Sequence, residues 1–170
     1  FYGTGLQATL QDCINPEGGI IFAYKVHDPE RYGVVSFDAS GKATSLEEKP
    51  KTPSSKFAVP GIYFYDNEVI SIAKKINPSP RGELEITDIN KAYLQNQKLQ
   101  VQELDSGTAW LDTGTFTSLM KAAQFVQVLQ ERQGLRIGAI EEVAYQMGYI
   151  NQEQHDTFIS PFIKSGYAKR

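Results

Sequence analysis

The chain has 170 residues and is poor in the residue types that mark several classes of protein. Its one cysteine, Cys13, has no second cysteine to pair with, so no internal disulfide can form. No apolar run approaches the roughly 20 residues that a membrane-spanning helix needs. We therefore expect a protein of a reducing, cytoplasmic compartment with no membrane partner.

An excess of positive charge is also missing. The formal net charge is −3, and the 17 Lys and Arg residues are dispersed along the chain. No basic face is then available to neutralise a nucleic-acid backbone, so a nucleic-acid partner is not expected. The chain contains no Gly-x-Ser-x-Gly elbow and no His-Glu-x-x-His helix, which argues against acyl-transfer enzymes and zinc hydrolases.

The most informative stretch that is present is Ala109 to Thr115, with the sequence Ala-Trp-Leu-Asp-Thr-Gly-Thr. Asp112 stands where an apolar run gives way to a helical pattern, and ligands bind at such strand ends in α/β sheets. Mg²⁺ is typically held by one or two carboxylates together with substrate phosphates, so Asp112 is a candidate metal ligand. The alternative is that Asp112 only caps the helix that starts near Phe116.

A second stretch, Leu46 to Pro50, places an acidic and a basic residue side by side at the end of a predicted strand. Glu48 could accept hydrogen bonds from sugar hydroxyls, and the Lys49 ammonium group suits a phosphate. Side chains alternate along a strand, so both residues reach one site only if the strand twists or ends there. The alternative is a solvated strand end.

Apolar runs and helical periodicity alternate along the chain, which indicates an α/β architecture. Gly19–Val26 is continuously apolar, as in a strand buried on both faces. The remaining predicted elements are a hairpin of 34–37 and 43–46, a strand of 59–65, a short edge strand of 101–104, helices of 69–76 and 83–96, a long helix from 116, and two or three helices after 137, one of them capped by Asn151 and Gln154.

Five ordered blocks resemble the sugar-phosphate nucleotidylyltransferases: 30–35, 46–50, 58–66, 81–88 and 109–115, with a continuation through 141–145. The Leu-Asp-Thr-Gly-Thr form is similar to the thymidylyl-transferring branch, with uridylyl- or adenylyl-transferring relatives as alternatives. The resemblance implies part of a Rossmann-like mixed sheet with flanking helices and a helical carboxyl-terminal tail. Residues 1–115 would be an incomplete nucleotidyltransferase domain and residues 116–170 a helical segment.

The resemblance also assigns roles to individual residues. Lys49 would neutralise the sugar phosphate, and Asp112 would share Mg²⁺ with an aspartate upstream of Phe1. The other expected substrate-binding residues are Tyr32, Gly33, Glu48, Val59, Gly61, Tyr63 and Trp110. The alternative for Val59 and Tyr63 is that they are plain core residues, and the alternative for Gly33 is that it relieves crowding in the hairpin. Arg81 could equally be a solvent-facing residue at the start of its helix.

The expected substrates are a nucleoside triphosphate, dTTP in this branch, and glucose 1-phosphate, with dTDP-glucose and pyrophosphate as products and a homotetramer as the assembly. The family's Gly-Gly-x-Gly-Thr-Arg-Leu loop is not found in the chain. We therefore expect a carboxyl-terminal portion that is inactive alone. The alternative is a non-catalytic sugar-phosphate binding or regulatory module. A metal-dependent glycosyltransferase would normally have an Asp-x-Asp pair after a strand, and this chain has none.

Overall fold

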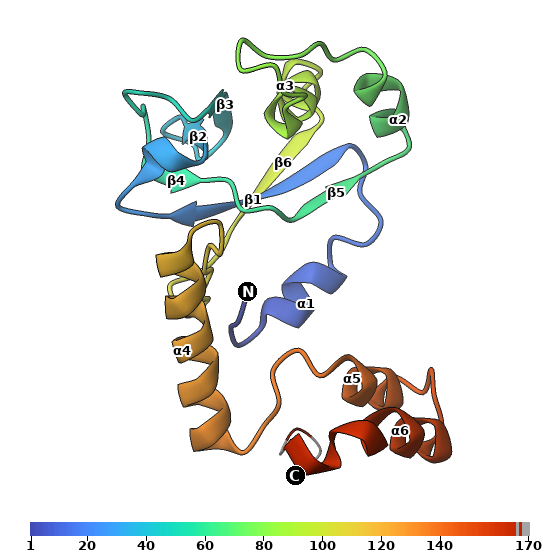
Figure 1. Ribbon diagram of the computed structural model, residues 1–170. Helices are drawn as coiled ribbons and strands as arrows, with labels where there is room; N and C mark the ends of the chain where they lie inside the picture. The colour runs from blue at the N-terminus through green and yellow to red at the C-terminus, as the bar shows by residue number, and fades with distance from the viewer. Residues whose placement is uncertain (166, 168–170) are drawn as a thin grey trace. The chain divides into compact units, whose positions relative to one another are not determined.

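A computed structural model describes residues 1–165 and 167 of the chain. It consists of two compact units, Phe1–Trp110 and Leu111–Arg170 (Figure 1). The functional division at residue 115 stays a prediction. Within the described residues, no helix is both long enough and apolar enough to span a bilayer.

The first unit is built on a mixed sheet of six strands. Strand β1 is central: it pairs antiparallel with β4 and β5, and parallel with β6 (Figure 1). Strand β2 pairs with β4 on one side and with β3 on the other. The strands are β1 Gly19–Lys25, β2 Gly33–Phe37, β3 Ala43–Glu48, β4 Phe57–Ala58, β5 Tyr63–Tyr65 and β6 Leu99–Glu103.

Strand β1 is buried on both faces, as its continuous apolar run predicts. Ile21 and Ala23 pack into a cluster with Val35 and Leu46 on the side of helix α3, Ile86–Gln95. Alternate residues of β1 point to the opposite side, where they pack against Cys13 and the short helix α1, Leu6–Gln11. The sheet therefore has two distinct faces, and we call them the α3 face and the α1 face.

The predicted hairpin is confirmed as β2 and β3. Its turn is held by Asp38, whose Oδ1 accepts hydrogen bonds from the backbone amides of Ser40 and Lys42. Gly41 has a φ of 81°, which glycine adopts at little cost. These contacts fix the register that pairs Gly33 with Glu48 at the open end of the hairpin.

The prediction of one strand over 59–65 is wrong in its extent. Only β4, Phe57–Ala58, and β5, Tyr63–Tyr65, are strands, and the segment between them is irregular. Pro60 has no backbone N–H to donate to a ladder, and its carbonyl accepts from the Ile62 amide at 2.8 Å in a tight turn. The aromatic residues of β5 had suggested a longer strand than this turn allows.

Helix α3 starts at Ile86, three residues later than predicted. The preceding residues form a turn in which the Ser79 amide donates to the Glu83 carbonyl and the Gly82 amide donates to the Ser79 carbonyl. The other helical elements of this unit are α2, Glu68–Ala73, and a short 3-10 turn, η1, Pro29–Arg31. Both α2 and α3 lie on the same side of the sheet in Figure 1.

The second unit is helical, as predicted. Its elements are α4 Phe116–Gln133, α5 Ile140–Gln146, α6 Gln152–Ile159 and a 3-10 segment η2 Ser160–Ser165. The capping box of Asn151 and Gln154 is confirmed at the start of α6. Helix α4 is capped by Thr115, whose side chain accepts from the Ser118 amide. Asp112 is therefore not the N-cap, and that alternative is wrong.

His155 is a buried polar residue of the second unit, only 2% exposed. It lies on α6, and its Nε2 is 3.4 Å from the Glu142 carboxylate on α5. Its ring also packs against Tyr145, with 5.3 Å between ring centroids. These contacts join the two helices.

We expect His155→Ala to destabilise the second unit by about 2 kcal/mol, because it leaves a cavity and removes one of the partners of the half-buried Glu142 carboxylate. Thermal unfolding followed by circular dichroism measures the loss. His27→Ala is the matched control, since the His27 side chain is 96% exposed. Equal melting temperatures for the two variants would show that His155 contributes no packing.

Candidate functional site

Glu48 is the last residue of β3, on the same face as Leu46 and therefore on the α3 face. Its Oε2 accepts a 2.5 Å hydrogen bond from the Thr87 hydroxyl. Gly33 stands opposite Glu48 in the ladder, and a Cβ on Gly33 would lie 3.2 Å from Thr87 Oγ1 and 3.3 Å from Glu48 Oε2. The missing side chain thus leaves room beside a fixed carboxylate.

Lys49 follows directly and has a left-handed backbone conformation, with φ of 42°. Such a φ is uncommon for a residue with a side chain. The Lys49 amide donates to the Tyr32 carbonyl at 3.0 Å, which ties the turn to the residue before β2. Because strand geometry ends at Glu48, the alternation rule no longer forces Lys49 to the face opposite Glu48, and its side chain is exposed.

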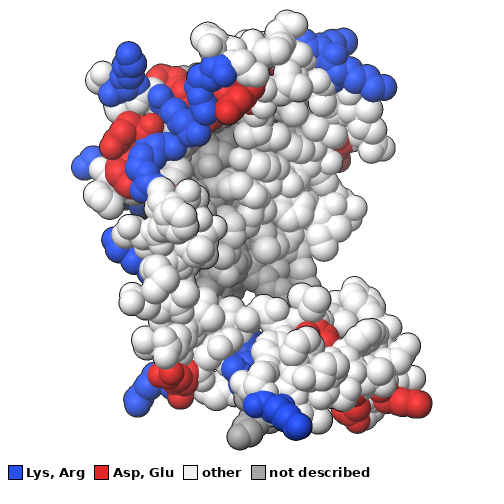
Figure 2. All heavy atoms as spheres, in the orientation of Figure 1, with Lys and Arg blue, Asp and Glu red and all other residues white. Residues whose placement is uncertain are grey.

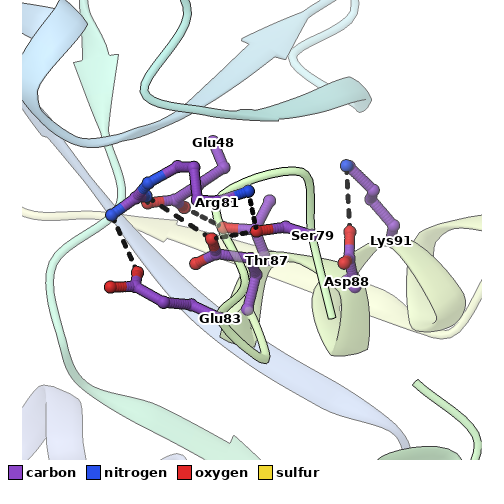
Figure 3. Close-up of polar contacts among 8 residues, drawn as sticks. Glu48, Ser79, Arg81, Glu83, Thr87, Asp88 and Lys91 are labelled. Atoms are coloured by element: carbon purple, nitrogen blue, oxygen red, sulfur yellow. Dashed lines mark hydrogen bonds and ion pairs between the residues drawn. The ribbon is translucent and has the colours of Figure 1, made fainter. Parts of the chain in front are cut away.

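Arg81 lies among three carboxylates at this end of the sheet (Figure 3). Its guanidinium nitrogens are 3.7 Å from Glu48, 2.8 Å from Glu83 and 3.4 Å from Glu85. Glu85 also accepts from the Ser79 hydroxyl at 2.9 Å. The side chain of Arg81 is 41% exposed. The alternative of a solvent-facing residue is therefore correct only in part.

Val59 and Tyr63 border the same corner. The Val59 amide donates to the Gly33 carbonyl at 2.8 Å, and a Cβ on Gly33 would lie 3.9 Å from the Val59 Cβ. Burial, followed by the charge of Glu48, raises the pKa of the Tyr63 phenol. The Tyr63 phenol is therefore neutral at physiological pH. The effect of the Glu48 charge indicates that the two side chains are near one another. The side chains of Val59 and Tyr63 also pack against the α3-face core, so the alternative that they are core residues is correct as well.

Trp110 belongs to an aromatic group with Tyr32 and Tyr24. Its ring centroid lies 4.8 Å from that of Tyr32, and the Tyr24 ring meets it edge-on at 5.8 Å. Tyr24 packs against the α1-face core. The chain from Tyr32 to Gly33, together with the Lys49–Tyr32 hydrogen bond, joins this aromatic group to the Glu48 corner.

Gly61 and Asp112 are the remaining predicted site residues. Gly61 is exposed, and a Cβ there would meet nothing within 4 Å. Asp112 belongs to the second unit, where its Oδ1 accepts from the Gly114 amide at 3.1 Å. No group of three or more metal-ligating side chains occurs in residues 1–165 and 167.

The charges around the site are of both signs. Figure 2 shows basic and acidic side chains next to one another on the visible face, which agrees with the dispersed charges of the sequence. Arg81 faces three carboxylates, whereas Lys49 is exposed and forms no ion pair with a carboxylate among the described residues. An anionic ligand at this corner would be attracted mainly by Lys49.

The nucleotidyl transferase family model matches residues 1–128. The chain belongs to this family. Curated relatives named glucose-1-phosphate thymidylyltransferase include those of Mycolicibacterium smegmatis, 55% identical, and Xanthomonas campestris, 46% identical. These matches cover 98% and 99% of this chain but 58% of each relative, so the chain spans a little over half of their length.

Two solved structures confirm the predicted α/β fold. A Bacillus anthracis structure described as a glucose-1-phosphate thymidylyltransferase, in complex with sucrose, is 42% identical with a TM-score of 0.59, over 71% of this chain and 47% of that one. A UDP-glucose pyrophosphorylase complexed with UDP-glucose is 20% identical with a TM-score of 0.56, over 72% and 46%. The second likeness concerns the fold alone.

The predicted site residues do not include three polar residues that the structure places at this corner, namely Ser79, Glu85 and Thr87. Thr87 is on α3, three residues before Asn90, and both are almost completely buried. Polar residues three apart on the inner face of an amphipathic helix are a signal that the sequence does carry.

Proposed function

We propose that the full-length protein transfers a thymidylyl group from dTTP to glucose 1-phosphate and releases pyrophosphate. The observation that carries the proposal is the corner where Gly33, Glu48, Lys49, Val59 and Tyr63 meet. Hydrogen-bond acceptors for hydroxyl groups, an exposed cation and a position without a side chain suit a small sugar phosphate. Relatives with 46% to 55% identity carry the name of this activity.

In this proposal the sugar lies against Gly33, and the Glu48 carboxylate accepts hydrogen bonds from its hydroxyl groups. Thr87 occupies one lone pair of Glu48 Oε2, and the remaining lone pairs of the carboxylate are enough for two hydroxyl groups. Val59 and Tyr63 line the pocket, and Trp110 and Tyr32 give it an aromatic wall. Gly61, which is exposed between β4 and β5, is proposed as the outer border of the same pocket. All eight residues with a proposed substrate contact, including Lys49, lie in the first unit.

The reaction requires positioning and charge neutralisation rather than a covalent group on the protein. A phosphate oxygen of glucose 1-phosphate forms a bond to the α-phosphorus of dTTP, and the bond from that phosphorus to the oxygen bridging to the β-phosphorus breaks. Lys49 would hold the attacking phosphate and offset its charge. Pyrophosphate leaves with the electron pair of the broken bond.

Mg²⁺ is the metal that we propose for the reaction. The carboxylate of Asp112 is an oxygen donor of the kind that Mg²⁺ prefers, and one protein carboxylate with substrate phosphates is an ordinary ligand set. Since Thr115 caps α4, the capping of that helix does not depend on Asp112. When bound, Mg²⁺ would offset the charge of the phosphates.

Pyrophosphate release by the full-length protein tests the proposal. We expect turnover with glucose 1-phosphate and dTTP, and a smaller kcat/KM with UTP or ATP. Calorimetric binding of glucose 1-phosphate without turnover would favour the non-catalytic binding module. A preference for UTP or ATP would indicate a uridylyl- or adenylyl-transferring enzyme instead. We also propose a homotetramer from the resemblance, and sedimentation of the same sample tests it.

Gly33→Ala is expected to raise the KM for glucose 1-phosphate by about tenfold, because the added methyl group crowds the Glu48–Thr87 pair and the space where the sugar would lie. Gly41→Ala, in the tip of the hairpin turn, is the control for effects on the hairpin itself. Its φ of 81° makes alanine strained there, so stability should fall while KM stays constant. An unchanged KM for Gly33→Ala would remove Gly33 from the sugar site.

A further inference from the structure

The buried side of helix α3 carries polar groups where apolar packing would be expected. Thr87 is 3% exposed and Asn90 is 1% exposed, and the two residues are one helical turn apart on the α3 face of the sheet. We call this pair the polar seam of α3. Burying such groups is costly unless each one is hydrogen-bonded, and both are.

Each residue of the polar seam bonds to a different strand. The Thr87 hydroxyl donates to the Glu48 carboxylate at the end of β3 (Figure 3). Asn90 Oδ1 accepts a 2.5 Å hydrogen bond from the hydroxyl of Tyr65 on β5. The Tyr65 ring is stacked on the Tyr63 ring, with 6.0 Å between centroids and an interplanar angle of 6°. One face of α3 is thus connected to Glu48 directly and to Tyr63 through Tyr65.

We propose that the polar seam of α3 is a positioning device for the sugar pocket: Thr87 fixes the Glu48 carboxylate, and Asn90, through Tyr65, fixes the Tyr63 ring. The inference rests on the proposed function, since Glu48 and Tyr63 are its sugar-binding residues. Glu48 ends its strand and has a flexible side chain of three rotatable bonds. A donor that holds one carboxylate oxygen reduces the rotamer freedom that sugar binding would otherwise remove.

The geometry around Thr87 supports a positioning role. Gly33 adds no side chain between the Thr87 hydroxyl and Glu48 Oε2, so the two oxygens meet directly. Arg81 lies 3.7 Å from the other oxygen, Oε1. The two carboxylate oxygens of Glu48 therefore have different neighbours, and its plane has a defined orientation before any ligand binds.

A third tyrosine supplies a matched control. Tyr93 of α3 is also buried, and its ring stacks on Tyr65 at 5.4 Å. Its hydroxyl, however, donates to Asp66 at 2.8 Å, and Asp66 also accepts from the Glu68 amide at the start of α2. Neither Asp66 nor Glu68 is part of the proposed pocket. Removing this hydroxyl tests the loss of a buried hydrogen bond without a sugar-binding partner.

The experiment compares single hydroxyl deletions in the full-length protein. We expect Thr87→Val to raise the KM for glucose 1-phosphate about tenfold, because a hydrogen bond to a charged group is lost, and Tyr65→Phe to raise it about threefold. Tyr93→Phe should change this KM less than twofold while lowering the melting temperature. The KM for dTTP should stay constant in all three variants, and Thr87→Ser should restore the parent KM.

A double-mutant cycle separates positioning from direct contact with the sugar. If Thr87 acts through Glu48, the effect of Thr87→Val on KM should fall to less than about threefold in a Glu48→Gln background, where the charge is gone. Thr87→Ala serves in the same cycle if the valine side chain does not pack. Equal fold-changes in the two backgrounds, or an effect of Tyr93→Phe as large as that of Thr87→Val, would overturn the inference.

The failure of the inference and the failure of the proposed function are distinguishable. A parent protein that neither binds nor turns over glucose 1-phosphate overturns the proposed function, and the positioning role falls with it. An active parent with additive variants overturns the positioning role alone. A shared loss of folding is detected by the melting temperature of each variant, measured beside its kinetics.

Discussion

Asp112→Asn is expected to lower thymidylyl transfer by the full-length protein by roughly a hundredfold and to raise the Mg²⁺ concentration needed for half-maximal rate. The substitution keeps the shape of the side chain and its hydrogen-bond acceptor for Gly114 but removes the charge that a divalent cation requires. Pyrophosphate release measured against Mg²⁺ concentration gives both numbers.

The chain offers a close control for this variant. Asp105 accepts a hydrogen bond from the amide of Gly107, two residues on, as Asp112 does from Gly114. Asp105→Asn should therefore reproduce any effect on the local turn and leave the Mg²⁺ dependence as in the parent. If both variants behave alike, Asp112 is a turn residue and the metal ligands lie elsewhere.

Lys49→Ala and Glu48→Gln should fail in different ways. Lys49 would face the attacking phosphate in the ground state and in the transition state, so its loss should raise the KM for glucose 1-phosphate and lower kcat, each by about tenfold or more. Glu48→Gln keeps the shape and part of the acceptor capacity, so it should mainly raise KM and weaken the discrimination between hexose phosphates.

Steady-state kinetics with glucose 1-phosphate and galactose 1-phosphate distinguish the two patterns. Lys51→Ala is the control for Lys49→Ala, because Lys51 is exposed, two residues further on and outside the proposed pocket. Calorimetry that finds parent-like binding of glucose 1-phosphate by both Lys49→Ala and Glu48→Gln would mean that the sugar pocket lies in another part of the protein.

Local patterns explain what the sequence could predict. The double-sided burial of β1, the hairpin around Asp38 and the capping box of Asn151 each depend on residues close in the chain, and all three are confirmed. The extent of the strand around Pro60 was not predictable from aromatic content, because the missing N–H and the turn decide where the ladder ends.

The site was predictable in its strand residues and not in its helix residues. Gly33 and Glu48 are adjacent because hairpin register places them so, and register follows from the local turn. Thr87 reaches Glu48 across 39 residues of chain, and no local pattern specifies that approach. The later start of α3 has a different, local cause, since Glu85 is engaged by Ser79 and Arg81 before the helix begins.

The pairing of β1 also bears on how the first unit folds as it is synthesised. Among the described residues, the strands that pair with β1 all follow it, and its parallel partner β6 ends at Glu103, about 80 residues later. The β2–β3 hairpin closes within a few residues and can form early, whereas a non-local parallel pair bears a large loop-closure entropy. Until β6 has left the ribosome, the edge of β1 that β6 covers lacks this partner, so we expect the nascent chain to be prone to aggregation and chaperone binding in that interval.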